Sequence, residues 1–274
     1  MFKEILKNVH EKTPLVHCIT NYVTVNDVAN VLLACGGSPI MADDIKDAED
    51  ITAICNALVI NLGTLNERTI TTMLNTGKAA NKLSHPVVLD PVGAGASKLR
   101  TDTTFEILKK VRLSVIRGNV SEIKTVSRGS GTTKGVDADV SDAITEATLD
   151  EGVAFAKGLS ARTGSIIAMT GAIDIVADPR KAYVVRNGRP QMSKITGTGC
   201  MLTGMIAAYI AANRDSMLDA AAAAVCVMGL SGELAYERAL KNNGGSSTYR
   251  TFIIDAISKM DDATLEGGMK IESR

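Results

Sequence analysis

The sequence predicts an α/β protein with a mostly parallel central sheet, flanked by helices and completed by a short antiparallel element. Two observations predict this fold. Short apolar runs rich in β-branched residues recur along the chain, and the stretches between them have the length and spacing of amphipathic helices. Strands of a parallel sheet are buried on both faces, so they appear in a sequence as continuous apolar runs.

Six apolar runs are expected to form the parallel strands: residues 15–19, 39–42, 57–62, 86–89, 113–116 and 165–169. Helices are expected between them, at residues 23–34, 67–83, 101–111 and 149–162. The alternation of the two kinds of segment places the strands in successive βα units.

The region after residue 170 breaks this alternation. Residues 174–185 are expected to form an antiparallel strand, which Asn187-Gly188 turns into a second strand over residues 189–195, because Asn-Gly favours tight hairpin turns. This hairpin leads into a glycine turn at residues 197–199 and then into a small-residue helix over residues 201–212.

Composition limits the classes of protein to consider. A chain of 274 residues with 45% hydrophobic content is expected to form a single domain over residues 1–274, since no stretch has the composition of a linker. The 30 Lys and Arg residues balance the 30 Asp and Glu residues, and no basic stripe is present, which argues against nucleic acid as a partner.

Cysteine usage and hydropathy predict a cytoplasmic protein without a membrane segment. The five cysteines form no C-x-x-C pair, and an odd number argues against a disulfide framework. The N-terminal residues lack the apolar region of a signal peptide, and the alanine run at residues 220–224 is too short to span a bilayer. The strongly apolar tract at residues 218–240 is expected to be covered by the core or by another subunit.

Ligands of an open α/β sheet bind outside the carboxyl ends of its strands. Each of the six predicted strands is followed by polar or glycine-bearing residues: Thr20-Asn21, Met41-Ala42, Asn61-Leu-Gly-Thr64, Asp90-Pro-Val-Gly-Ala-Gly95, Arg117-Gly-Asn-Val-Ser-Glu122 and Thr170-Gly171. We therefore expect the binding site at this edge of the sheet, together with the glycine turn.

The glycine turn has the features of an anion cradle. Gly197 and Gly199 allow close approach of a ligand to the backbone, and the first N–H groups of the following helix point towards it. Cys200 lies at the mouth of this cradle, where the helix polarity favours a negatively charged sulfur. The same pattern also occurs as a tight connection without a ligand, and a single cysteine among apolar residues is often only a packed side chain.

Asp90 and Glu122 are candidate ligands of Mg²⁺. A carboxylate at the end of a buried strand is costly unless it binds a cation or forms hydrogen bonds, and Mg²⁺ takes few direct protein ligands. The alternative is structural: Asn119 and Glu122 have the spacing of a capping box, and both roles are compatible.

Arg117 and Thr170 are candidate partners of phosphate oxygens, or else residues of a surface ion pair and a turn. The chain lacks the Walker A pattern, the G-x-G-x-x-G pattern and the G-x-S-x-G elbow. His10, His17 and His85 have no metal-ligand spacing and are expected to be structural or surface residues. The sequence thus favours a user of phosphate groups that binds them with a different turn.

These residues resemble the hydroxyethylthiazole kinase family of the ribokinase-like superfamily, over residues 14–239. The resemblance rests on blocks at residues 17–26, 34–42, 61–64, 89–95, 117–122 and 197–200. It implies a ribokinase-like three-layer sandwich that transfers the γ-phosphoryl group of ATP to the hydroxyl of 4-methyl-5-(2-hydroxyethyl)thiazole in thiamine biosynthesis or salvage. It also implies Mg²⁺ as cofactor and a homotrimer with active sites between subunits.

The resemblance also implies a role for each matching residue. The thiazole pocket is expected to comprise Asn21, Val23, Met41, Gly63 and Gly197. ATP is expected to contact Arg117, Thr170 and Asn119, and Mg²⁺ to be held by Asp90 and Glu122. Catalysis is expected from Cys200 and from the turn Gly197, Thr198 and Gly199, whose amides stabilise the transferring phosphoryl group. Two features depart from the family pattern, namely Asp27 and the tail after Lys259, and the sequence gives that tail no role.

Three alternatives stay open at this point. One is another ribokinase-like vitamin kinase, of the hydroxymethylpyrimidine type, and another is a protein that binds thiazole or thiamine without turnover. A sugar kinase is the third, although it would need more hydrogen-bonding side chains than Val23 and Met41 provide.

Overall fold

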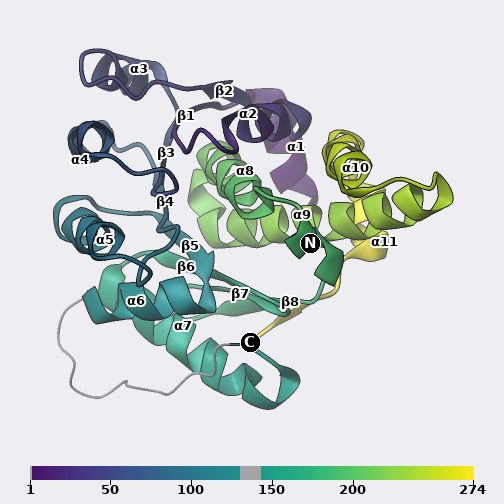
Figure 1. Cartoon of the computed structure of the whole chain (residues 1–274). Coiled ribbons are helices and arrows are strands. Elements are labelled where there is room, and N and C mark those ends of the chain that lie inside the picture. Colours follow the sequence, from purple (N-terminus) through teal and green to yellow (C-terminus); the bar gives the residue numbers. More distant parts are fainter. Residues whose placement is uncertain (1, 130–142) are drawn as a thin grey trace.

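A computed structural model describes residues 2–129 and 143–274, which contain a sheet of nine strands in the order β2-β1-β3-β4-β5-β6-β7-β8-β9. Strands β2 to β6 pair in parallel, and β7, β8 and β9 continue the sheet with antiparallel pairing (Figure 1). The strands are β1 (Leu15–Ile19), β2 (Ser38–Ile40), β3 (Ala57–Asn61), β4 (Val87–Asp90), β5 (Val115–Asn119), β6 (Ile166–Thr170), β7 (Asp174–Ala177), β8 (Ala182–Val185) and β9 (Ile271–Ser273).

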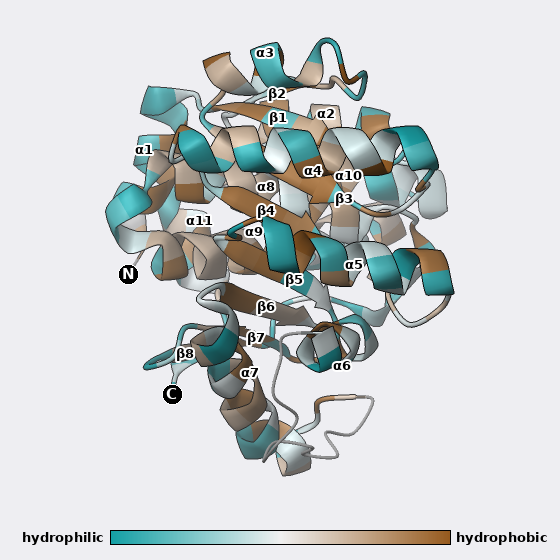
Figure 2. Cartoon of the chain, turned by 90° about the vertical axis from the view of Figure 1, so that its left-hand side faces the viewer, coloured by the Kyte–Doolittle hydropathy of each residue, from teal (hydrophilic) through white to brown (hydrophobic). Residues whose placement is uncertain are grey.

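Helices cover both faces of the sheet and make three layers. The helices are α1 (Lys3–Lys12), α2 (Val25–Ala34), α3 (Ala48–Ile54), α4 (Glu67–Lys82), α5 (Lys98–Lys110), α6 (Val120–Gly129), α7 (Leu149–Thr163), α8 (Thr198–Ala212), α9 (Met217–Lys241), α10 (Ser246–Ser258) and α11 (Asp262–Gly268). Alternate strand residues face opposite layers: Leu58 and Ile60 pack with α4 to α7, whereas Val59 packs with α1, α2, α8 and α9. Figure 2 shows the apolar strands behind the more polar outer surfaces of α4 and α5.

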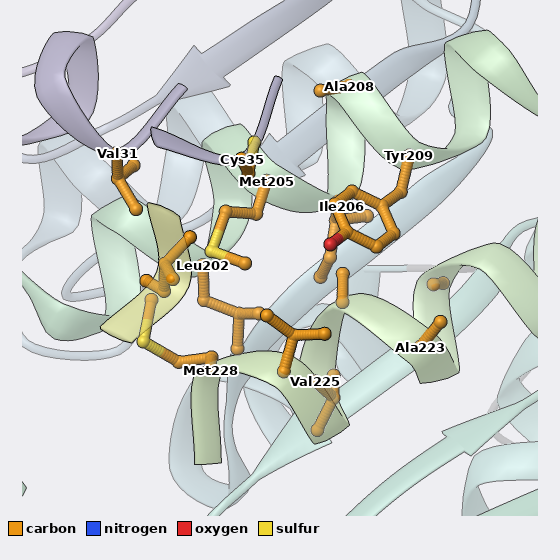
Figure 3. Close-up of a cluster of buried hydrophobic side chains, with 14 of the residues drawn as sticks. Val31, Cys35, Leu202, Met205, Ile206, Ala208, Tyr209, Ala223, Val225 and Met228 are labelled. Atoms are coloured by element: carbon orange, nitrogen blue, oxygen red, sulfur yellow. The ribbon is translucent and has the colours of Figure 1, made fainter. Parts of the chain in front are cut away.

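Helices α8 and α9 form the apolar centre of one layer. Leu202, Met205 and Ile206 of α8 face Val225 and Met228 of α9 in Figure 3, and all five side chains are buried. By length and composition the helical segment Arg214–Lys241 is apolar enough to cross a membrane, but 78% of its most apolar window is buried inside the fold. The chain's own core therefore covers most of the apolar tract predicted to be covered, although Leu234 and Leu240 near its end are exposed.

The predicted parallel strands and the four helices between them are confirmed, with ends that differ by a few residues. The predicted antiparallel hairpin is wrong in its position. Residues 174–185 form two strands rather than one, and the turn between them includes Asp178, whose carboxylate accepts hydrogen bonds from the N–H groups of Arg180 and Lys181, both at 2.7 Å. This aspartate turn, followed by Pro179, outweighs the Asn187-Gly188 signal.

The segment expected to form the second hairpin strand is a 3-10 helix instead, η2 (Pro190–Lys194). The strand that pairs with β8 on its outer side comes from the C-terminal tail, as β9. The helix after the glycine turn begins at Thr198, three residues earlier than expected. Helices α1, α3, α10 and α11 were not predicted, and α6 was indicated only by its possible capping box.

Candidate active site

Three buried polar side chains meet below the N-terminus of α8. Asn21 follows β1, Asn61 ends β3 and Asp90 ends β4, and their exposed fractions are 5%, 2% and 0%. The Asn21 Nδ2 donates to Asn61 Oδ1 at 3.0 Å, and the Asn61 Nδ2 donates to Asp90 Oδ2 at 2.9 Å. The strand ends therefore place a continuous hydrogen-bonded row under the helix.

Cys200 lies on top of this row. Its Sγ accepts hydrogen bonds from the Nδ2 atoms of both Asn21 and Asn61, each at 3.3 Å. One turn further along α8, Thr203 donates its hydroxyl to Asp90 Oδ2 at 2.7 Å. The first turn of α8 is thus bound to the ends of three strands through side chains, which fixes the position of the thiol.

Glycine is required at the two positions of the turn for different geometric reasons. Gly197 is the residue before α8 and has a φ of +91°, a left-handed conformation that glycine adopts without strain. Gly199 lies against Arg117, because a Cβ at Gly199 would stand 2.4 Å from Arg117 Nη1. The turn therefore brings a guanidinium beside the free amides of the helix N-terminus.

Arg117 and Thr170 lie together, as the sequence predicted. The Arg117 Nη2 donates to Thr170 Oγ1 at 2.8 Å, and Nη1 lies 3.7 Å from Asp90 Oδ2. A guanidinium between a hydroxyl and a helix N-terminus forms a cluster of donors suited to the oxygens of an anion.

Asp90 is a fully buried carboxylate, and its surroundings disfavour its charged form. Burial raises the pKa of its carboxyl above the usual value, although the Arg117 charge and the hydrogen bonds from Thr203 and Asn61 act in the opposite direction. Its Oδ1 atom has no hydrogen-bond partner within the described residues, whereas Oδ2 is held by Asn61 and Thr203. A buried acceptor oxygen of this kind fits a cation or a water molecule bound to one.

Glu122 occupies the predicted capping box. Its Oε2 accepts the Asn119 N–H at 2.8 Å, and the Asn119 Oδ1 accepts the Glu122 N–H at 2.9 Å. Its other oxygen, Oε1, accepts the Gly93 N–H at 2.9 Å, and the Glu122 charge is close enough to affect the pKa of Asp90. Each oxygen keeps a second lone pair, so capping is compatible with a cation between Glu122 and Asp90.

No group of three or more His, Cys, Asp or Glu side chains with the geometry of a metal site occurs within residues 2–129 and 143–274. Asp90 and Glu122 are close enough for their charges to interact, and a pair of carboxylates is the small number of direct protein ligands that Mg²⁺ usually takes.

Two cavities lie near Cys200. The larger, of about 510 Å³, has Arg117, Thr170 and Gly199 among its lining residues, together with apolar side chains of α8 and α9 such as Leu202 and Met228. The smaller, of about 300 Å³, is lined by Asn61 and Met41 among others. Asn61 thus connects the smaller cavity to the thiol, and Arg117 connects the larger one to Asp90.

The other residues predicted for substrate binding, Asn21 included, do not line the smaller cavity. Gly63 donates its N–H to Asn61 Oδ1 at 2.9 Å. It also packs against the Asn21 side chain, because a Cβ at Gly63 would lie only 2.5 Å from the Cβ of Asn21. Val23 is 58% exposed at the surface. Gly197 lies beside Thr24, on the helix side.

His17 holds one wall of the smaller cavity. Its Nε2 lies 2.8 Å from the Ala42 carbonyl and therefore donates, which leaves Nδ1, 2.6 Å from Thr52 Oγ1, to accept. Burial lowers the pKa of this imidazole and keeps it neutral. The prediction of a structural histidine is confirmed for His17, which positions the backbone next to Met41.

Sequence reasoning missed several residues of the site. The sequence places Asn61 at the end of a strand but gives it no role, although it contacts both Cys200 and Asp90. Thr203 could have been found from its place one helical turn after Gly199. Asp174 lines the larger cavity and accepts the Gly171 N–H, and burial raises its pKa to about 7. Met228, on a helix distant in sequence, gave no local signal.

The fold is that of the ribokinase-like class of proteins. A ribokinase-like superfamily protein from Enterococcus faecalis has the same fold, with a TM-score of 0.62 over 93% of this chain and 88% of its own, at 14% identity. The chain belongs to the hydroxyethylthiazole kinase family, whose model matches residues 6–263. It is therefore a kinase.

Two relatives are similar over nearly their whole length. The hydroxyethylthiazole kinase of Clostridium acetobutylicum is 61% identical over 273 residues, which cover 100% of both chains. The solved structure of a hydroxyethylthiazole kinase protein from Pyrococcus horikoshii has a TM-score of 0.88 and 32% identity, over 99% of this chain and 98% of its own.

We expect Asp90→Asn to stabilise the ligand-free protein near neutral pH. Because burial raises the pKa of Asp90, its ionisation favours the unfolded chain. This loss of stability is absent below about pH 4 and grows as the pH rises through the raised folded-state pKa. The difference in unfolding free energy between variant and wild type, measured by urea unfolding at several pH values, should therefore increase with pH.

The exposed Asp102, paired with Lys98 at 2.6 Å, offers a matched control. Asp102→Asn should show no such increase. A difference for Asp90→Asn that stays constant between about pH 4 and about pH 8 would contradict the raised pKa.

Proposed function

We propose that this protein transfers the γ-phosphoryl group of ATP to the hydroxyl of 4-methyl-5-(2-hydroxyethyl)thiazole, as a step of thiamine biosynthesis or salvage. Membership of the family and similarity to hydroxyethylthiazole kinases support this activity. The observation that carries the proposal is the place of Cys200, which is linked by Asn61 to a small cavity and by the turn of α8 to a larger one.

ATP is proposed to bind in the larger cavity. The donors Arg117 and Thr170 and the amides of the α8 N-terminus would hold phosphate oxygens, whereas the apolar side chains of α8 and α9 would contact the base. Asn119 lines another cavity, of about 430 Å³, with Glu122 and Gly93, and we assign it to the phosphate end because it follows Arg117 by two residues in β5.

The thiazole alcohol is proposed to bind in and around the smaller cavity. Met41 supplies a polarisable thioether for a sulfur-containing ring, and Asn21 places an amide beside the thiol. Gly63 and Gly197 support this pocket through the backbone. Val23, exposed in the single chain, is proposed to complete the pocket in the assembled protein.

Mg²⁺ is proposed as the cofactor, held by Asp90 and Glu122 directly or through water. Its chemistry would be to neutralise charge on the transferred phosphate. The unpartnered Oδ1 of the buried Asp90 supports this assignment, because that oxygen needs a positive partner.

Cys200 is proposed to orient the substrate hydroxyl and to accept its proton. The N–H donors of Asn21 and Asn61 point at Sγ and fix the sulfur as an acceptor. The amides of Thr198 and Gly199, at the start of α8, would stabilise the charge of the transferring group. Phosphoryl transfer depends more on positioning and charge than on proton removal.

A homotrimer with active sites between subunits is proposed for the assembly, and residues 1–274 are proposed to form a single kinase domain in the cytoplasm. Tyr22 and Val23, next to Asn21, are 79% and 58% exposed, which leaves an apolar surface beside the small cavity for a second subunit. The nine-stranded sheet supports one domain. The five cysteines are free, which suits a reducing compartment.

The activity is tested by a coupled assay of ADP release with the thiazole alcohol, with and without Mg²⁺. ADP formation should require both the alcohol and the cation. A parallel panel with hydroxymethylpyrimidine and simple sugars separates the other kinase alternatives. ADP release that ignores the thiazole alcohol would contradict the proposal, and tight thiazole binding without turnover would identify a binding protein.

We expect Cys200→Ala to lower kcat by about 100-fold or less, because general base catalysis contributes only part of the rate. Cys200→Asp should retain activity, since a carboxylate at this position can accept the same proton. Steady-state kinetics with the folded variants measures both. An inactive Cys200→Asp variant with an unchanged circular dichroism spectrum and melting temperature would exclude the role as base.

We expect Val23→Asp to dissociate the trimer and to lower activity at least about tenfold, because a charge would be buried between subunits. Sedimentation velocity gives the oligomeric state. Leu83→Asp is the matched control. Leu83 is 45% exposed and lies between α4 and β4, at the amino ends of the strands, whereas Val23 lies at their carboxyl ends. A wild-type monomer with full activity would exclude the shared site.

A further inference from the structure

The wall of the larger cavity includes a segment, residues 187–193, that connects β8 with the glycine turn. Asn187, Gly188, Arg189, Pro190, Met192 and Ser193 all line the cavity. The segment has no partner strand of its own, since β8 ends at Val185 and η2 is a short 3-10 helix. Its position must therefore be set by contacts with other elements.

Helix α9 has two glycines where this segment packs against it. A Cβ at Gly229 would stand 2.7 Å from both Asn187 Cβ and Asn187 O, and a Cβ at Gly232 would stand 2.3 Å from Met192 Sδ. The two glycines therefore let the segment approach the helix closely. Contact with small residues alone does not fix the segment along the helix axis.

Glu233, next to Gly232, supplies a polar anchor. Its Oε1 accepts the Gly188 N–H at 2.9 Å and the Asn187 Nδ2 at 3.3 Å. Glu233 is only 8% exposed. A buried carboxylate with only neutral donors is costly, so the anchor needs a cation.

Lys270 is that cation, and it comes from the C-terminal tail. Its Nζ donates to Glu233 Oε1 at 2.9 Å and Oε2 at 2.8 Å, and its backbone N–H donates to Asn187 Oδ1 at 2.7 Å. Burial would raise the pKa of Glu233, but the bonds from Lys270, Gly188 and Asn187 together lower it. The carboxylate is therefore kept charged by the tail.

The backbone of the tail supports the same contact. Strand β9 pairs antiparallel with β8, and the Arg186 N–H donates to the Lys270 carbonyl at 2.8 Å, directly before the cavity segment (Figure 1). The Asn187 Nδ2 also donates to the Gly268 carbonyl at 2.9 Å. Lys270 lies beyond residues 6–263, the range that the family model matches.

We propose that Lys270 and Glu233 are positioning residues for nucleotide binding: together they hold the segment 187–193 in place as a wall of the nucleotide cavity. This role gives the tail after Lys259 a function at the larger cavity, which is lined by residues from other parts of the chain. It rests on the proposed binding of ATP in the larger cavity.

The test compares Lys270→Met, Lys270→Arg and the control Arg274→Met. Arg274 belongs to the same tail and pairs with Glu272 at 2.9 Å and with Asp150 at 2.5 Å, but it does not contact the cavity segment. Steady-state kinetics gives KM for ATP, KM for the thiazole alcohol and kcat. Calorimetric titration with ATP gives its Kd, and hydrogen–deuterium exchange reports on the peptide that contains residues 187–193.

Lys270→Met should raise KM and Kd for ATP roughly fivefold or more, a typical coupling between linked sites. KM for the thiazole alcohol and kcat should change less than about twofold, and exchange in the segment should accelerate. Lys270→Arg should restore most of the ATP affinity, because it keeps the charge, and Arg274→Met should resemble wild type.

Two results would overturn the proposal. One is a Lys270→Met variant that exchanges faster in the segment, or melts at a lower temperature, yet binds ATP with wild-type affinity. The other is exchange in the segment that stays at the wild-type rate. Failure of the proposed function is distinct, because the wild-type protein itself would then show no ATP binding while the exchange measurement still reports on the segment.

Discussion

The site depends on one buried carboxylate. Asp90 ends a central strand, is fully buried, and is held by Asn61, Thr203 and Arg117, which come from three other elements. Removing a charge from water at this depth is unfavourable, and these partners offset only part of the cost, so the pKa stays raised. The charged form of Asp90 therefore stays unfavourable in the folded chain, and a bound cation would stabilise it.

That carboxylate also connects the sheet to helix α8. Thr203 and Cys200 lie on the first two turns of α8 and bond to residues at the ends of β3 and β4. The glycine turn, the thiol and the guanidinium of Arg117 therefore form one rigid unit rather than a loop placed over the sheet. A phosphoryl-transfer site needs this kind of preorganisation, because its catalysis consists mainly of positioning and charge stabilisation.

Local sequence patterns predicted the parallel half of the fold well. A parallel strand is buried on both faces, so it appears in the sequence as a short continuous apolar run. They failed in the antiparallel half. There the Asp178 turn competed with Asn187-Gly188, and the strand that pairs with β8 comes from residues more than 80 positions away in the chain. Strand-end reasoning brought Asp90, Arg117 and Thr170 to one place, but it gave no signal for Met228 or Lys270, whose positions depend on tertiary packing.

The pairing of β9 with β8 has a consequence for biosynthesis. The bond between Lys270 and Asn187 joins residues 83 positions apart and closes a loop that includes α8, α9, α10 and α11. We expect such a long-range closure to come late in folding, because its entropic cost is regained only when the intervening helices are packed. A ribosome-bound chain that ends before residue 270 already contains the glycine turn and the thiol, but the cavity edge at residue 187 lacks its tether. The nascent protein would thus acquire its chemical groups well before it acquires a finished binding surface.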